Sequence, residues 1–192
     1  MRQKHPNFLL IAGNARNVGK SNLAVAIIQR FSRIYPVVGL KVSAVYPGDE
    51  PYHGHHTDQT PATWSLFQET SPDTNKDTSK FLKAGATSVW FLRARDEFLA
   101  EGFSALLKKI EPDALVVCES RSLIKLVEPG SFILIEKHFD GFPVKDVTSL
   151  IPLADLRIIT GAGKYDTEEV LAFIETDGKR WHVSAPNRMI YP

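Results

Sequence analysis

Cysteine and long apolar runs are both scarce in this sequence. Cys118 is the single cysteine, so no disulfide can form within the chain, and a lone thiol fits a reducing compartment. No apolar segment approaches the roughly 20 residues that a membrane-spanning helix requires. The run that precedes Gly13 has only five apolar residues, too few for the apolar centre of a signal peptide. We therefore expect a cytoplasmic protein with no membrane partner.

Neither sign of charge dominates the sequence. Its 23 lysines and arginines nearly balance its 22 aspartates and glutamates, which leaves a formal net charge of +1. So small a charge gives no general attraction to nucleic acid, and we expect no nucleic-acid partner. The 192 residues suit one sizeable domain better than two, so we expect a single domain over 1–192.

Strand-like and helix-like apolar patterns alternate along the chain. Residues 7–12 and 37–45 are apolar runs that predict strands, and residues 20–34 have apolar positions at helical spacing. Further strands are predicted at 87–93, 114–118, 132–135 and 156–160, and further helices at 77–84, 98–110 and 167–174. The alternation predicts a three-layer α/β fold with a mainly parallel central sheet. Residues 46–76 have no clear period and are predicted to form a long functional loop.

A glycine-bounded loop joins the first predicted strand to the first predicted helix. It reads Gly13-Asn14-Ala15-Arg16-Asn17-Val18-Gly19-Lys20-Ser21, and Asn22 follows it in the helix. Backbone N–H groups of such a loop bind phosphate together with the positive end of the helix dipole. The standard phosphate-loop motif has its first glycine at the position of Asn14, whereas this chain has it one residue earlier.

The loop predicts a P-loop nucleotide site over residues 13–22. Gly19 would let the backbone approach phosphate closely, and Lys20 would be the catalytic cation at the β and γ phosphates. The Ser21 hydroxyl would ligate Mg2+. The base, guanine or adenine, stays open, so the expected ligand is GTP or ATP. An ordinary strand-to-helix turn with an exposed lysine and serine is the alternative.

Three charged residues elsewhere are candidates for the same site. Glu119 ends an apolar strand and should emerge at the carboxyl edge of the sheet as a metal ligand, although it could also face solvent. Lys41 lies inside an apolar strand and should not be buried without a charged partner. It is expected either beside phosphate or a substrate anion, as a second catalytic residue, or as a lysine that reaches solvent. Asp77 precedes a predicted helix, where an N-cap is the common role.

Two further features stay open. Arg16 could clamp phosphate, reach across a homodimer or face solvent. His53, His55 and His56 could bind a metal ion, but no other strong ligands accompany them, and contacts to a substrate are the alternative.

Residues 13–21 resemble the loop of dethiobiotin synthetase and its relatives, which also has five residues between its two glycines and a valine before the second. The strand Gly39-Leu40-Lys41-Val42 resembles the second strand of that group, which brings a lysine into the site. The resemblance implies that Lys41 belongs to the nucleotide site.

Two later segments resemble the MobB family, nucleotide-binding adaptors in the synthesis of molybdopterin guanine dinucleotide. Residues 76–86 resemble its Asp-Ser/Thr segment before a short helix ending in Ala-Gly-Ala, and residues 113–119 resemble its acidic strand. The resemblance implies that Asp77 joins Ser21 and Glu119 at Mg2+.

Three functions follow from these patterns. The first is a MobB-like adaptor in cofactor biosynthesis that binds GTP or ATP with Mg2+, hydrolyses it slowly and works with a cofactor-synthesis protein. The second is an ATP-dependent ligase or small-molecule kinase similar to dethiobiotin synthetase, with a small-molecule acceptor. The third is a degenerate P-loop domain that binds nucleotide weakly and acts through a protein partner.

Overall fold

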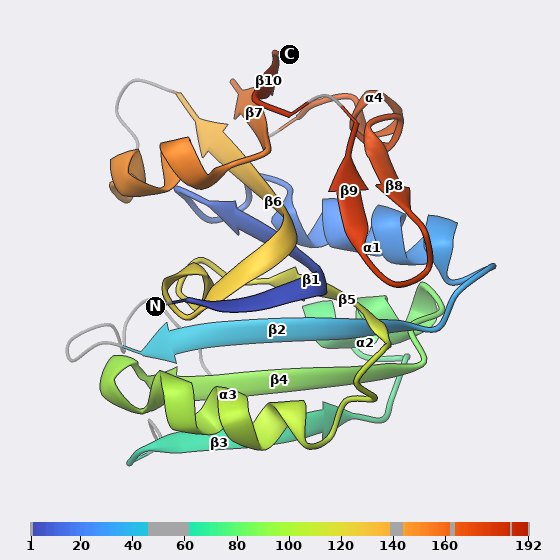
Figure 1. The fold of residues 1–192 in the computed structure, drawn as a ribbon, viewed down its shortest axis with the longest axis vertical. Coiled ribbons are helices and arrows are strands. Elements are labelled where there is room, and N and C mark those ends of the chain that lie inside the picture. The colour runs from blue at the N-terminus through green and yellow to red at the C-terminus, as the bar shows by residue number, and fades with distance from the viewer. Residues whose placement is uncertain (1, 46–61, 139–143, 162–163, 185, 192) are drawn as a thin grey trace.

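An eight-stranded sheet forms the centre of the computed structural model, which describes residues 2–45, 62–138, 144–161, 164–184 and 186–191 (Figure 1). The strand order is β10-β7-β6-β1-β5-β2-β4-β3, and every pair is parallel except β3 with β4. The strands are β1 (Gln3–Gly13), β2 (Val37–Val45), β3 (Trp64–Glu69), β4 (Ser88–Arg95), β5 (Leu115–Glu119), β6 (Val127–Lys137), β7 (Leu156–Thr160) and β10 (Arg188–Ile190).

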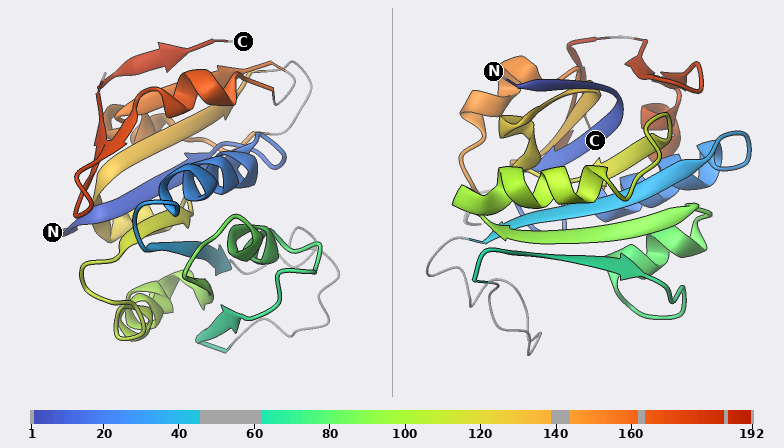
Figure 2. Two further views of the ribbon diagram at one scale, coloured as in Figure 1. Left: turned by 90° about the vertical axis from the view of Figure 1, so that its right-hand side faces the viewer. Right: turned by 60° about the horizontal axis from the view of Figure 1, so that its bottom comes forward.

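Helices cover both faces of this sheet (Figure 2). One face packs against α1 (Lys20–Phe31), α2 (Asp77–Lys83), α4 (Thr167–Leu171) and the hairpin of β8 (Ile174–Thr176) and β9 (Trp181–Val183). The other face packs against α3 (Leu99–Leu107) and the short 3-10 helices η3 (Leu123–Lys125) and η4 (Thr148–Leu153), while η2 (Asp96–Phe98) leads into α3. The predicted α/β fold with a mainly parallel central sheet is therefore confirmed.

Strand β1 lies at the centre of the sheet, and its position there explains its unbroken apolar run. Leu9 and Ile11 pack into the core beneath α1, whereas Phe8, Leu10 and Ala12 pack into the core beneath α3. A central strand of a parallel sheet is buried on both faces, so its residues are apolar on both sides.

The predicted loop over 46–76 is wrong in part, because β3 lies within it and pairs antiparallel with β4 at the edge of the sheet. Trp64 and Leu66 pack on the α3 side, while Phe67 is 47% exposed on the other side. Because Phe67 is apolar and yet exposed, β3 lacks the alternation of apolar and polar residues that usually marks a half-buried strand. Residues 46–61, which include His53, His55 and His56, lie outside the described residues, so their predicted roles stay predictions.

Several element bounds also differ from the predictions. Helix α1 ends at Phe31 instead of residue 34, and the predicted helix over 98–110 is divided into η2 and α3. The predicted helix 167–174 ends at Leu171, because Ile174 begins β8. None of the helices in the described part of the chain has the length and apolar character to span a lipid bilayer.

Candidate functional site

The ends of β1, β5 and β2 meet where α1 begins. In register, Ile11 of β1 lies beside Glu119 of β5, and Glu119 lies beside Lys41 of β2. Val117 packs in the core beneath α1, and alternation along β5 places Glu119 on the same face two residues later. The carboxyl edge of the sheet therefore brings two charged side chains to the first turn of α1.

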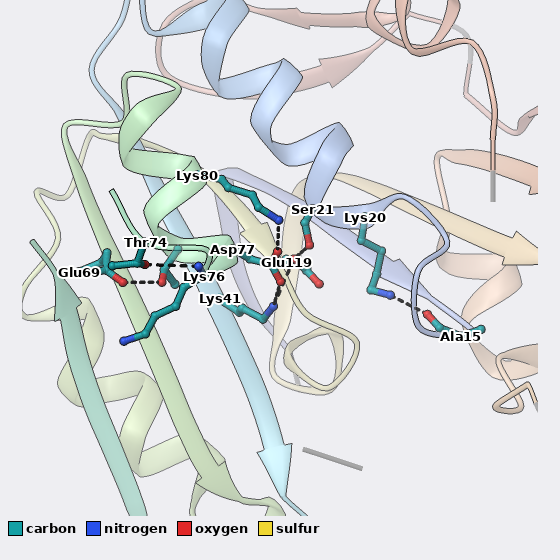
Figure 3. A network of polar contacts seen from close by, with 11 residues as sticks. Ala15, Lys20, Ser21, Lys41, Glu69, Thr74, Lys76, Asp77, Lys80 and Glu119 are labelled. Atoms are coloured by element: carbon teal, nitrogen blue, oxygen red, sulfur yellow. Dashed lines mark hydrogen bonds and ion pairs between the residues drawn. The ribbon is translucent and has the colours of Figure 1, made fainter. Parts of the chain in front are cut away.

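The loop over residues 13–21 wraps around the side chain of Lys20 (Figure 3). Lys20 Nζ donates a hydrogen bond of 2.7 Å to the carbonyl of Ala15 in the same loop. Burial lowers the pKa of Lys20, and the nearby charge of Glu119 opposes that shift. The loop thus holds a half-buried ammonium group beside the N–H groups at the start of α1, an arrangement that favours an anion.

The displaced first glycine of the loop has a structural reason. A Cβ on Gly13 would lie 2.8 Å from Cγ2 of Val18 and 3.1 Å from Cδ of Lys20, so a side chain there would disturb the loop. Asn14 has instead a structural task. Its amide donates to the carbonyl of Lys137 (3.1 Å) and accepts from the N–H of Lys137 (2.8 Å), which ties the loop to the end of β6.

Tyr165 lies against the second glycine, a contact that the sequence patterns did not reveal. Its hydroxyl donates to the carbonyl of Gly19 (3.0 Å), and a Cβ on Gly19 would lie 2.7 Å from Cε1 of the ring. Burial raises the pKa of Tyr165, so the phenol remains protonated as a donor. Gly19 has a φ of 96°, a left-handed conformation that glycine adopts at little cost.

Substitution of Gly19 by alanine is expected to destabilise the fold by about 1–3 kcal/mol, because it adds a strained φ and a collision with Tyr165. Urea unfolding measures the effect. Gly161→Ala is the matched control, since a Cβ at Gly161 would meet no atom of the described residues within 4 Å. Equal losses of stability in the two variants would contradict this account of the loop.

Glu119 is buried rather than directed to solvent. Its side chain is 10% exposed, and its Oε2 accepts a hydrogen bond of 2.7 Å from the hydroxyl of Ser21. The same oxygen lies 3.8 Å from Lys41 Nζ. Glu119 therefore links the first turn of α1 to the lysine of β2.

Lys41 has its main partner in Asp77. Its Nζ donates to Oδ2 of Asp77 at 2.6 Å, while Lys80 Nζ donates to Oδ1 at 3.1 Å (Figure 3). The N-cap alternative for Asp77 is wrong, because Lys76 is the N-cap of α2 and makes no side-chain capping bond. The carboxylate of Asp77 is instead held between two lysines.

Replacing Asp77 with asparagine is expected to flatten the acid limb of the stability profile. Burial alone would raise the pKa of Asp77, but hydrogen bonds and charge from Lys41 and Lys80 hold it below its ordinary value of 3.8. A carboxylate with a lowered folded-state pKa stabilises the fold above its unfolded pKa, and this contribution disappears as the pH falls through the folded-state pKa. Urea unfolding between neutral and strongly acidic pH checks this, with the exposed Asp113→Asn as control. An unchanged acid limb in Asp77→Asn would contradict the contact.

The segment before α2 is fixed by contacts that the sequence patterns missed. Glu69 of β3 accepts a hydrogen bond of 2.7 Å from the hydroxyl of Thr78, and Thr74 hydrogen-bonds Ser79. Both contacts lie beside Asp77 at the start of α2 (Figure 3). The sequence has no signal for Glu69, because the edge strand β3 lacks a clear alternation of apolar and polar residues.

The structure brings together five of the predicted site residues, namely Lys20, Ser21, Lys41, Asp77 and Glu119. Arg16, Asn17 and Asn22 are exposed, and Val18 is buried beneath the loop. Within the described ranges, no three His, Cys, Asp or Glu side chains cluster as a metal site. The candidate magnesium ligands are two carboxylates and one hydroxyl, an all-oxygen set that suits a hard cation.

Comparison of the chain with protein-family models, with curated proteins and with solved structures gave no match.

Proposed function

We propose that the chain is a P-loop protein that binds GTP or ATP with Mg2+ on residues 13–21 and hydrolyses it slowly. The observation that carries the proposal is the line of polar contacts from Ser21 through Glu119 and Lys41 to Asp77. These contacts lie at the first turn of α1 and at the carboxyl edge of a parallel sheet, where α/β proteins bind ligands.

Phosphate recognition would come from the loop itself. The N–H groups at the start of α1 favour negative charge, because the helix dipole has its positive end there. Lys20 would exchange its hydrogen bond to the Ala15 carbonyl for one to a phosphate oxygen. As a fixed cation, it would stabilise the charge that develops on the phosphate during hydrolysis.

Mg2+ would be held by Ser21, Glu119 and Asp77. The ion prefers oxygen ligands and usually keeps several waters besides substrate phosphates, so few protein ligands suffice. When bound, it supplies positive charge that neutralises the phosphate oxygens. Lys41 would then balance part of the negative charge of Asp77 and Glu119.

We also propose that nucleotide binding serves a MobB-like adaptor in cofactor biosynthesis. The segment that resembles MobB proteins forms α2. Its Asp77 accepts a hydrogen bond from Lys41, and Lys41 lies 3.8 Å from Glu119. This placement supports a shared use of Asp77 at the nucleotide. An adaptor would act with a protein of cofactor synthesis and would need only slow turnover.

A second candidate, a ligase or small-molecule kinase, is favoured by Lys41. Its ammonium group lies between two carboxylates, and its side chain is still 24% exposed, so an acceptor could reach it. Phosphate release from ATP and from GTP, measured with magnesium and with and without small organic anions, separates the candidates. Slow release that anions leave unchanged supports the adaptor, and fast release that depends on an anion supports the ligase or kinase. No release and no magnesium dependence would leave a degenerate P-loop domain.

A further inference from the structure

Next to Lys41, several side chains of β2 and β4 are only partly buried. Phe81 of α2 covers the sheet at Gly39, where a Cβ would lie 3.0 Å from Cβ of Phe81. One step toward the carboxyl edge, Asp77 at the first turn of α2 meets Lys41. In Figure 1, α2 lies behind the amino-terminal halves of β2 and β4, and both strands continue past it. Farther along these two strands, Ser43, Phe91 and Arg93 are partly exposed.

The register of β2, β4 and β3 shows which side chains lie next to one another on this face. Lys41 of β2 lies beside Phe91 of β4, which lies beside Phe67 of β3. In the next row, Arg93 of β4 lies between Ser43 and Ser65. Because alternate residues share a face, both rows lie on the α2 side of the sheet. We call Phe67, Phe91 and Arg93 the aromatic platform.

The platform is partly exposed, and its arginine has no partner among the residues that the structure describes. Phe67 is 47% exposed, and Phe91 and Arg93 are partly exposed. Arg93 makes no hydrogen bond or ion pair within the described part of the chain, whereas its neighbour Arg95 pairs with Glu97 at 3.3 Å. An arginine fork that is partly buried without a carboxylate is suited to a planar anion such as a carboxylate or a phosphate.

We propose that the aromatic platform binds a small organic anion with a flat apolar body, as the second ligand beside the proposed nucleotide site. The flat body would lie on Phe67 and Phe91, and its anionic group would bind the guanidinium of Arg93. Strands in a sheet are about 4.8 Å apart, so the platform begins about one strand from Lys41 and two from Glu119. The role as second ligand depends on the proposed function, but binding itself depends only on the platform.

The charges around the platform favour an anionic ligand. Lys41 already has two carboxylate partners, so its charge is largely balanced. Arg93 adds a positive charge that no described acidic side chain offsets, and the serines on either side of it are neutral hydrogen-bonding groups. Stacking of a flat ring on phenylalanine and a charge-assisted bond to arginine would together orient the ligand.

Titration of the full chain with benzoate and with phenyl phosphate, followed by NMR, tests the proposal. We expect saturable shifts of the signals of Phe67, Phe91 and Arg93 with one or both anions, and much weaker shifts with benzamide, the uncharged analogue. Arg93→Gln should weaken binding about tenfold or more, since it removes a charged hydrogen-bond donor. Phe67→Ala should also weaken binding, through loss of the ring contact.

Control variants distinguish binding at the platform from binding elsewhere on the protein. Arg95→Gln removes a paired arginine of the same strand, and Ile34→Ala removes an exposed apolar side chain elsewhere; both should bind the anions as the wild type does. The shifts at Phe67, Phe91 and Arg93 with benzoate do not involve the phosphate loop, so failure of the nucleotide proposal leaves this one standing. The proposal is overturned by equal binding of benzamide, by unchanged affinity in Arg93→Gln, or by no saturable shift at the platform with either anion. Shifts that follow protein concentration instead would identify a second copy of the chain as the occupant and also overturn it.

Discussion

Replacing Lys20 with alanine is expected to abolish measurable nucleotide binding while the protein keeps its fold. In the structure, the Lys20 ammonium group hydrogen-bonds the Ala15 carbonyl of its own loop. Loss of one such bond lowers the free energy of unfolding by about 1 kcal/mol, a tolerable change for a domain. The loss of a cation at phosphate should weaken nucleotide affinity by about a hundredfold or more.

Circular dichroism and urea unfolding would establish that Lys20→Ala is folded, and isothermal titration calorimetry would measure its affinity for ATP and GTP. Lys83→Ala is the matched control, because it removes the same charge from an exposed position at the end of α2. Wild-type affinity in Lys20→Ala would overturn the assignment of residues 13–21 to phosphate.

Replacing Glu119 with glutamine should remove the dependence of nucleotide binding on magnesium. The glutamine side chain can still accept the hydrogen bond from the Ser21 hydroxyl, so the start of α1 should keep its geometry. It no longer carries the charge that faces Lys41 and that a divalent cation requires. Some nucleotide affinity should remain, because Lys20 and the loop are unchanged.

Melting temperatures with nucleotide, measured with and without magnesium, check the effect. Magnesium should raise the melting temperature of the wild-type complex, since a ligand that binds the folded state stabilises it. It should change that of Glu119→Gln little. Glu128→Gln, at an exposed position of β6, controls for the lost charge. A wild-type magnesium effect in Glu119→Gln would place Glu119 outside the metal site.

The sequence allowed the central elements to be predicted because burial on both sides of the sheet forces unbroken apolar runs. Strand β1 and helix α1 have such clear patterns that their boundaries differ from the predictions by only a few residues. The edge strand β3 has one exposed face and an exposed Phe67, so its pattern resembles that of a loop. Strands β8, β9 and β10 have three residues each, too few to show a period.

For the candidate site, local sequence patterns predicted Ser21 at the start of a helix and Glu119 at the end of a strand. Their hydrogen bond joins residues 98 positions apart, and it follows once β1 and β5 are neighbours. The pairing of Lys41 with Asp77 could not be derived in this way, because it depends on where α2 docks. Tyr165 is similar: its position against Gly19 depends on the chain between β7 and α4, for which no motif exists.

Calorimetric titration of the purified protein with ATP and with GTP, each with and without magnesium, tests the central claim most directly. The account predicts saturable binding of at least one triphosphate at one site per chain, tighter with magnesium and lost in Lys20→Ala. No binding of either nucleotide at millimolar concentrations, by protein shown to be folded, would contradict it.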